Sequence, residues 1–221
     1  NVAFNWGAMR RNHVCYQWLR DSISRGDIGD LRYAVLYHLT DLIKHHPHTL
    51  DLVGMLLGDP KPIWVEGRLA EKGSLLDTGD TRRGPPDAEN DFKRPLLPLP
   101  TFDEAGHRFV PPQGHKIADP MVDFYRVGYE NGAVGAFVPV PGVMEVEVWG
   151  TEGRAYAWDN GDIAGVRRRS NGNLAKQEMT VRPSGESPTV CTIRDIIREM
   201  ETGQRTAGNI DVTMQAVEAQ F

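Results

Sequence analysis

The feature that most constrains the fold is a succession of short strand-like segments in the second half of the chain. They cover residues 122–129, 133–140, 143–149, 154–158, 163–169 and 177–182. The first two flank Asn131-Gly132, a dipeptide that strongly indicates a tight β-hairpin. Glycine-rich turns separate most of the others, and no helical period lies between them. The pattern therefore predicts an antiparallel sheet rather than βαβ units.

Segments with helical or strand character surround this sheet. Helical periodicity covers residues 12–25, 48–57, 188–202 and 209–221, and two further strands are expected at 31–39 and 63–69. Ser187 precedes Pro188, a combination of capping residue and first helical residue that indicates a helix start, and Gly203 marks its end. These elements predict an α+β fold, a mostly antiparallel open β-sheet with helices packed on one face.

A proline-rich stretch at about residues 71–120 interrupts the pattern. It contains more than half of the 15 prolines, and no helical or strand period crosses it. A segment this long without secondary structure is uncommon inside a compact domain. It is therefore expected to be a functional loop, an assembly arm or a partly disordered insertion. The rest of the 221 residues is expected to form a single domain, 1–221, around it.

Charge and composition exclude several classes of protein. The net charge of −5 gives no reason to expect nucleic acid, and the only basic run, at residues 167–169, is expected to be a solvated strand face or turn. No apolar run approaches the roughly 20 residues of a membrane span, and the first residues lack a signal-peptide pattern. Cys15 and Cys191 lie on separate expected helices, so a reducing cytoplasm is the expected location.

Five short motifs together resemble the Gfo/Idh/MocA family of oxidoreductases. They are residues 5–11 (NWGAMRR), 23–31 (ISRGDIGDL), 48–60 (HTLDLVGMLLGDP), 129–133 (YENGA) and 148–154 (VWGTEGR). Each motif is weak alone, but all five occur in the family's order and spacing. The resemblance implies the C-terminal, substrate-binding half of an NAD(P)-dependent oxidoreductase that acts on a sugar, sugar acid or cyclitol.

The same resemblance implies a nucleotide-binding part that this sequence does not contain. Members of the family carry an N-terminal Rossmann domain with a glycine-rich fingerprint and a Glu-Lys-Pro segment, and neither motif occurs here. Residues 1–5 (NVAFN) are typical of the middle of a strand, so we expect a domain to precede them. NAD or NADP is accordingly expected only in the complete enzyme, with no tight binding to this chain alone.

The resemblance also points to an acid–base pair. In the family this work falls to the lysine and to an Asp-x-x-x-His or Asp-x-x-x-Tyr pair, whose two side chains share one helix face. Asp51 matches the aspartate, but Met55 stands four residues later and cannot transfer a proton. His48 is the expected substitute, hydrogen-bonded to Asp51. The alternative is that Asp51 only braces the helix start while His48 packs beneath it.

Further polar residues are expected at the substrate. Arg10 or Arg11 would bind polyol oxygens, or else form surface ion pairs, and Lys44, His45 and His46 would line the pocket rim. A zinc site built from the histidines and Asp51 is the less favoured alternative, because Pro47 is expected to break the helix between His46 and His48. No metal is therefore predicted.

The partner expected besides a small-molecule sugar or polyol is a second copy of the chain. By the family resemblance, the large sheet joins dimers or tetramers through its open face. A sheet face bearing Val, Phe and Trp would require such a partner. The alternative function is therefore an oligomerisation or assembly module without catalysis of its own. A metal-dependent isomerase or hydrolase is ranked below both.

Overall fold

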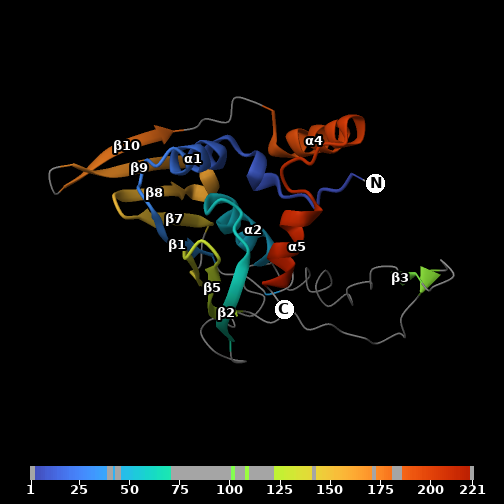
Figure 1. Ribbon diagram of the computed structural model, residues 1–221, viewed down its shortest axis with the longest axis horizontal. Helices are drawn as coiled ribbons and strands as arrows, with labels where there is room; N and C mark the ends of the chain where they lie inside the picture. Colours follow the sequence, from blue (N-terminus) through green and yellow to red (C-terminus); the bar gives the residue numbers. More distant parts are fainter. Residues whose placement is uncertain are drawn as a thin grey trace, which may run out of the picture.

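The computed structural model describes residues 3–38, 42, 46–70, 101–102, 108–109, 122–140, 143–170, 173–180 and 186–219 (Figure 1). Within these ranges the chain forms one large mixed sheet with helices against it. Of the proline-rich stretch, the description includes only a pair of two-residue strands, β3 (Thr101–Phe102) and β4 (Arg108–Phe109). The expectations for the rest of that stretch lie outside the described residues.

The sheet has eight strands in the order β10-β9-β8-β7-β1-β6-β5-β2. They are β1 (Leu31–Tyr37), β2 (Pro62–Leu69), β5 (Val122–Tyr129), β6 (Val134–Val138), β7 (Glu145–Gly150), β8 (Gly153–Trp158), β9 (Ile163–Ser170) and β10 (Asn173–Thr180). Only β1 and β6 are parallel, and every other neighbouring pair is antiparallel. The predicted α+β class with a mostly antiparallel sheet is confirmed.

One face of the sheet is covered by helices α1 (Val14–Ser24) and α2 (His46–Leu56) (Figure 1). Period-two alternation turns Ala34 and Leu36 of β1 toward them, and both are buried. The helices contribute fully buried side chains to the same core, including Leu19 and Leu52. Helix α5 (Ile210–Glu218) packs on α2. The opposite face of the described sheet carries the other set of alternating side chains.

Local signals set most helix ends. In α4 (Pro188–Thr202) the Ser187 hydroxyl accepts a hydrogen bond from the Val190 amide, and Gly203 ends the helix with φ of 68°. One prediction is wrong: α2 begins at His46, so Pro47 lies inside its first turn instead of breaking it. Proline is tolerated there because a first-turn amide has no carbonyl partner within the helix. No helix among the described residues is long and apolar enough to cross a membrane.

Buried tyrosines predict a loss of stability at alkaline pH. Tyr16 is fully buried, and burial raises the pKa of its phenol to about 12. Burial also raises the pKa values of Tyr125 and Tyr129 above 10. The unfolded chain loses these protons near pH 10, while the folded chain keeps them. The free energy of unfolding therefore falls as the pH rises from 10 toward 12. From Tyr16 alone we expect a loss of about 1.4 kcal/mol at pH 11.

Urea unfolding at pH 9 and pH 11 measures this loss, and Tyr16→Phe is the matched control. The variant lacks the titrating proton, so its stability should fall less between the two pH values. An equal fall in both proteins would contradict the assignment to Tyr16.

Candidate functional site

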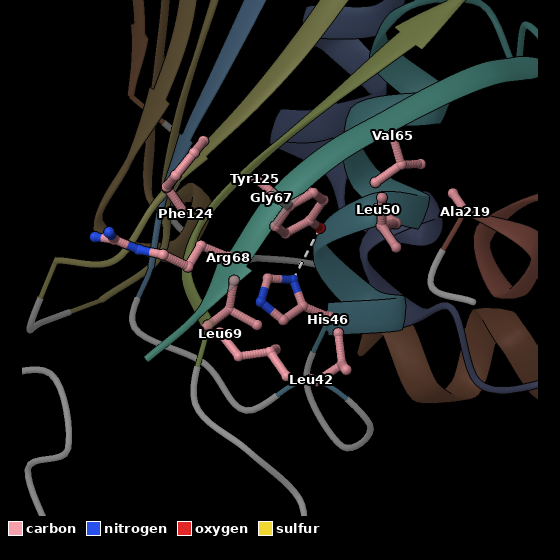
Figure 2. A pocket seen from close by; sticks show the side chains of 11 residues that line it. Leu42, His46, Leu50, Val65, Gly67, Arg68, Leu69, Phe124, Tyr125 and Ala219 are labelled. Atoms are coloured by element: carbon pink, nitrogen blue, oxygen red, sulfur yellow. Dashed lines mark hydrogen bonds between the residues drawn. The ribbon is translucent and has the colours of Figure 1, made fainter. Parts of the chain in front are cut away.

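A pocket opens between the start of α2, the end of α5, the edge strand β2 and its neighbour β5 (Figure 2). Its volume is about 270 Å³. The walls are mainly aliphatic and aromatic, with one buried imidazole and one guanidinium among them. The lining residues are Leu42, His46, Leu50, Val65, Gly67, Arg68, Leu69, Val122, Phe124, Tyr125 and Ala219.

His46 and Tyr125 form the polar part of the pocket wall, and Figure 2 shows the two rings directed toward each other. Nδ1 of His46 lies 2.8 Å from the Tyr125 hydroxyl oxygen, and Thr49 Oγ1 lies 3.3 Å from the same nitrogen. Tyr125 stacks on Phe137 with a centroid distance of 4.0 Å. Burial raises the pKa of Tyr125 well above its ordinary value, so the phenol stays protonated. His46 and Tyr125 can therefore hydrogen-bond to each other in a pocket whose walls are mainly apolar.

The first helix residue and a strand residue meet here because β5 passes under the start of α2. Tyr125 belongs to the set of β5 side chains that faces the helices, together with the buried Val127. Arg68, on β2, stands at the edge of the pocket and pairs with Asp123. Such a pocket suits the apolar face of a ring with one or two hydrogen-bonding groups.

A second polar centre lies under α2 and is fully engaged in ion pairs. Nε of Arg11 donates to Oδ1 of Asp51 at 2.8 Å, and its Nη2 donates to Oδ1 of Asp59 at 2.7 Å. Arg11 and Asp51 are 4% and 3% exposed, so both charges are shielded from water. We call these three residues the Arg11 cluster. It ties the segment before α1 to the helix and to the turn that follows it.

The electrostatics of the Arg11 cluster reflect burial opposed by pairing. Burial raises the pKa of the Asp51 carboxyl, and the Arg11 guanidinium opposes that rise. Burial alone would lower the pKa of Arg11, but Asp59 and Asp51 outweigh it and raise the value. Asp59 reaches this position through a left-handed turn with φ of 54°, in which its amide donates to the Gly54 carbonyl at 2.8 Å.

The structure gives Asp51, one of the two residues that were predicted to form an acid–base pair, a partner from another segment. The partner of the Asp51 carboxylate is Arg11, whereas the sequence predicted His48. The half-buried His48 ring stacks on Trp6, with centroids 4.8 Å apart and planes 14° apart. This arrangement supports the alternative in which Asp51 braces the helix. It places His48 against the segment that leads into the fold.

Of the remaining predicted site residues, the structure describes Arg10 and His46, which lie on different elements. Arg10 lies in the 3-10 helix η1 (Met9–Asn12), and its Nη2 donates to Asn160 Oδ1 at 3.3 Å. Lys44 and His45 fall outside the described residues. Of the predicted contacts that the structure describes, His46 lines the pocket of Figure 2. Within the described ranges no three His, Cys, Asp or Glu side chains come close enough together to hold a metal ion.

Sequence reasoning missed three residues that shape these centres: Trp6, Asp59 and Tyr125. Their contacts span 42, 48 and 79 positions of sequence. Only Asp59 carried a local signal, because it follows Gly58 and precedes Pro60 in an expected turn. The structure places Tyr125 in the core and on the pocket wall.

No family model matches the sequence, and no curated protein is significantly similar to it. Solved structures, in contrast, match over nearly the whole chain. UDP-N-acetylglucosamine 3-dehydrogenase GnnA from Acidithiobacillus ferrooxidans is 13% identical, with a TM-score of 0.57 over 97% of this chain and 58% of its own. Levoglucosan dehydrogenase in complex with NADH and L-sorbose is 14% identical, with a TM-score of 0.60 over 96% of this chain and 62% of its own.

An NAD binding oxidoreductase from Klebsiella pneumoniae matches at 15% identity and a TM-score of 0.62, over 96% of this chain and 61% of its own. The neighbouring structures are Gfo/Idh/MocA-type oxidoreductases. The chain has the fold of the C-terminal domain of these enzymes. It spans about 60% of the length of the proteins that it matches.

Proposed function

We propose that this chain is the substrate-binding domain of an NAD(P)-dependent oxidoreductase that acts on a hydroxyl group of a sugar, sugar acid or cyclitol. The observation that carries the proposal is the match of 96–97% of the chain to sugar oxidoreductases. One of these holds NADH and L-sorbose together. In the proposal, NAD or NADP is held by a separate domain of the complete enzyme, and this chain supplies the opposite wall of the cleft.

The described residues suggest which side chains transfer the proton and which contact the substrate. Oxidation of an alcohol needs a group that accepts the hydroxyl proton while hydride leaves to nicotinamide. We assign that role to His48, which stands at the start of α2 with Trp6 stacked on its ring. Arg10 is the proposed polyol contact, because the family resemblance places an arginine of this segment at the cleft; its Nη2 donates to Asn160 Oδ1 at 3.3 Å.

The other predicted residues take different roles in this proposal. His46 presents its imidazole in the pocket of Figure 2, and Lys44 and His45 remain proposed substrate contacts. Arg11 and Asp51 hold α2 in position, because their side chains pair with each other in a buried ion pair. They are positioning residues, and their loss should affect folding before it affects chemistry.

Coenzyme reduction by the full gene product tests the proposal. A panel of D-glucose, D-gluconate and myo-inositol is offered with NAD⁺ and with NADP⁺, and the reduced coenzyme is followed by its absorbance. We expect turnover of at least one polyol with one of the two coenzymes. Absence of NADH and NADPH binding by the full gene product would contradict the proposal.

A second function is assembly, and a different observation favours it. The match to the super-repressor mutant of Gal80p from Saccharomyces cerevisiae, with a TM-score of 0.55, indicates that this fold alone does not determine activity. On the open sheet face, Tyr33 lies opposite Trp149 and Tyr37 lies opposite Val138. Trp149 and Val138 are 36% and 38% exposed. We propose that this face joins two or four copies of the chain.

Light scattering after size exclusion measures the assembly. We expect a dimer or tetramer, and Val138→Glu should dissociate it, because the new carboxylate would lose its hydration at the interface. Glu130→Gln, in the exposed turn after β5, is the control that should leave the mass unchanged. A monomeric parent protein would contradict the interface.

A further inference from the structure

The walls of the pocket in Figure 2 carry few polar groups for a domain that binds a sugar. Among the described lining residues, His46, Arg68 and Tyr125 have polar side chains, and the others are aliphatic residues, glycine and Phe124. Arg68 extends away from the His46–Tyr125 pair in Figure 2, and it forms an ion pair with Asp123. The described walls therefore offer a ligand two hydrogen-bonding side chains, which already contact each other.

A sugar or cyclitol ring would lose hydration in such a pocket without replacing it. Each hydroxyl group that leaves water needs a new hydrogen-bond partner, and an unpaired one opposes binding. The ring carries several hydroxyls, more than the side chains of His46 and Tyr125 can satisfy. An aromatic or alkyl group has no such requirement, and its removal from water favours binding. The pocket therefore suits the apolar part of a ligand.

The aromatic part of the wall is fixed by packing. Tyr125 stacks on Phe137 with centroids 4.0 Å apart, and the His46 ring meets it edge-on at 4.6 Å. Gly67 of β2 leaves room for the Tyr125 side chain, because a Cβ atom on Gly67 would lie 2.5 Å from Tyr125 Cβ. A wall that is already ordered costs little conformational entropy when a ligand binds. The pocket is therefore preorganised for a flat or compact apolar group.

The size and place of the pocket fit a substituent of the proposed substrate. A cavity of about 150 Å³ lined by apolar side chains is enough to bind benzene. The volume of about 270 Å³ is larger, so it accommodates a phenyl ring or a short alkyl chain. His46 and His48 both lie in the first turn of α2, only about 3 Å apart along the helix axis. A molecule at the proposed proton acceptor could therefore reach the pocket.

We propose that the pocket of Figure 2 binds an aglycone, the apolar non-sugar part of a glycoside, and that the substrate is an aryl or alkyl glycoside instead of a free sugar. This inference rests on the proposed function. The aglycone lies among Leu50, Val65 and Leu69, which line the pocket. The hydroxyl group that is oxidised lies outside the pocket, at His48.

Calorimetric titration of the full gene product with phenyl and methyl β-D-glucosides, and with the two matching β-D-galactosides, tests the pocket. The phenyl and methyl compounds of each pair differ only in the size of the apolar group. We expect the phenyl compound of at least one pair to bind about tenfold more tightly or better, because its ring leaves water. Equal affinities within both pairs, or no binding of either phenyl glycoside, would overturn the proposal.

Substitutions on β2 assign the preference to this pocket. Leu69→Asp puts a carboxylate on the apolar wall and should abolish the advantage of the phenyl compound. Val65→Phe, which fills part of the pocket without adding charge, should reduce the same advantage several-fold. Both residues are about half exposed, so neither change disturbs the core. Ile63→Asp is the matched control, because Ile63 is 60% exposed on the same strand and does not line the pocket. A preference for the phenyl compound that survives Leu69→Asp and Val65→Phe would overturn the assignment.

Steady-state kinetics separate failure of the pocket from failure of the proposed function. With NAD⁺ or NADP⁺, kcat/KM should be at least several-fold higher for the preferred phenyl glycoside than for its methyl counterpart. A full gene product that reduces coenzyme with both compounds at equal kcat/KM overturns the aglycone pocket and leaves the proposed function standing. One that binds a phenyl glycoside but neither NADH nor NADPH overturns the proposed function, and with it the identification of the glycoside as a substrate.

Discussion

Replacement of Arg11 by methionine is expected to lower the free energy of unfolding by about 3–5 kcal/mol at neutral pH. Methionine fills part of the same volume, but it leaves the Asp51 carboxylate, 3% exposed, without its guanidinium. Breaking a buried ion pair on one side is far more destabilising than losing an exposed one, because the remaining charge keeps its desolvation penalty. Urea denaturation followed by circular dichroism measures the change.

The defect should also depend on pH in a defined direction. Burial already raises the pKa of Asp51, and loss of Arg11 removes the charge that opposes the rise. Below the unfolded pKa of about 3.9, both states of the variant hold the proton and no penalty remains. The penalty then develops as pH rises through the folded-state pKa. Relative to the parent protein, Arg11→Met should therefore be least destabilised in acid.

Two controls separate burial from charge. Arg20→Met removes a guanidinium paired with Asp21 at the surface, where the two side chains are 38% and 53% exposed. Its effect should stay within about 1 kcal/mol. Arg11→Met combined with Asp51→Leu removes both buried charges and should recover part of the lost stability. A loss below about 1 kcal/mol in Arg11→Met itself would contradict the bracing role of the cluster.

Replacement of His48 by alanine in the full gene product is expected to lower kcat for polyol oxidation by more than about tenfold. The proposal gives this imidazole the task of accepting the hydroxyl proton, and alanine cannot perform it. The fall in kcat with decreasing pH that reports a histidine base should also disappear from the pH profile. Steady-state kinetics across pH, with folding checked by circular dichroism, provide both readouts.

His13→Asn is the matched control for a histidine outside the proposed site. His13 accepts a hydrogen bond from the Cys15 amide at the start of α1, and asparagine is also a good helix cap. We expect its kcat and pH profile to resemble those of the parent enzyme. An unchanged kcat in His48→Ala would reduce His48 to a packing partner of Trp6.

Features coded by neighbouring residues could be predicted from the sequence. Helix α4 has the expected bounds, because Ser187, Pro188 and Gly203 act within one turn of the helix ends. The hairpin of β5 and β6 follows from Asn131 and Gly132, where Asn131 Oδ1 accepts from the Ala133 amide at 3.1 Å. The sheet class followed from the succession of such local signals.

Features that depend on distant parts of the chain could not be predicted. The sequence suggested His48, three residues away, as a partner of Asp51, and it gave no sign of the bond from Arg11, 40 residues away. Helical spacing placed Val190, Ile193 and Ile197 on one face of α4, but that face is exposed, and Asn12 of a distant segment contacts Thr192 on the opposite side. Spacing within a helix indicates which side chains share a face, and the contacts of the fold decide where that face points.

We propose that this chain provides one wall of a two-domain cleft and that the other domain binds the coenzyme. Titration of NADH into the purified chain, followed by calorimetry, tests it most directly. The account predicts no saturable binding to this chain and clear binding to the full gene product. A micromolar dissociation constant for the chain alone, or coenzyme reduction by it in the presence of a polyol, would contradict the account.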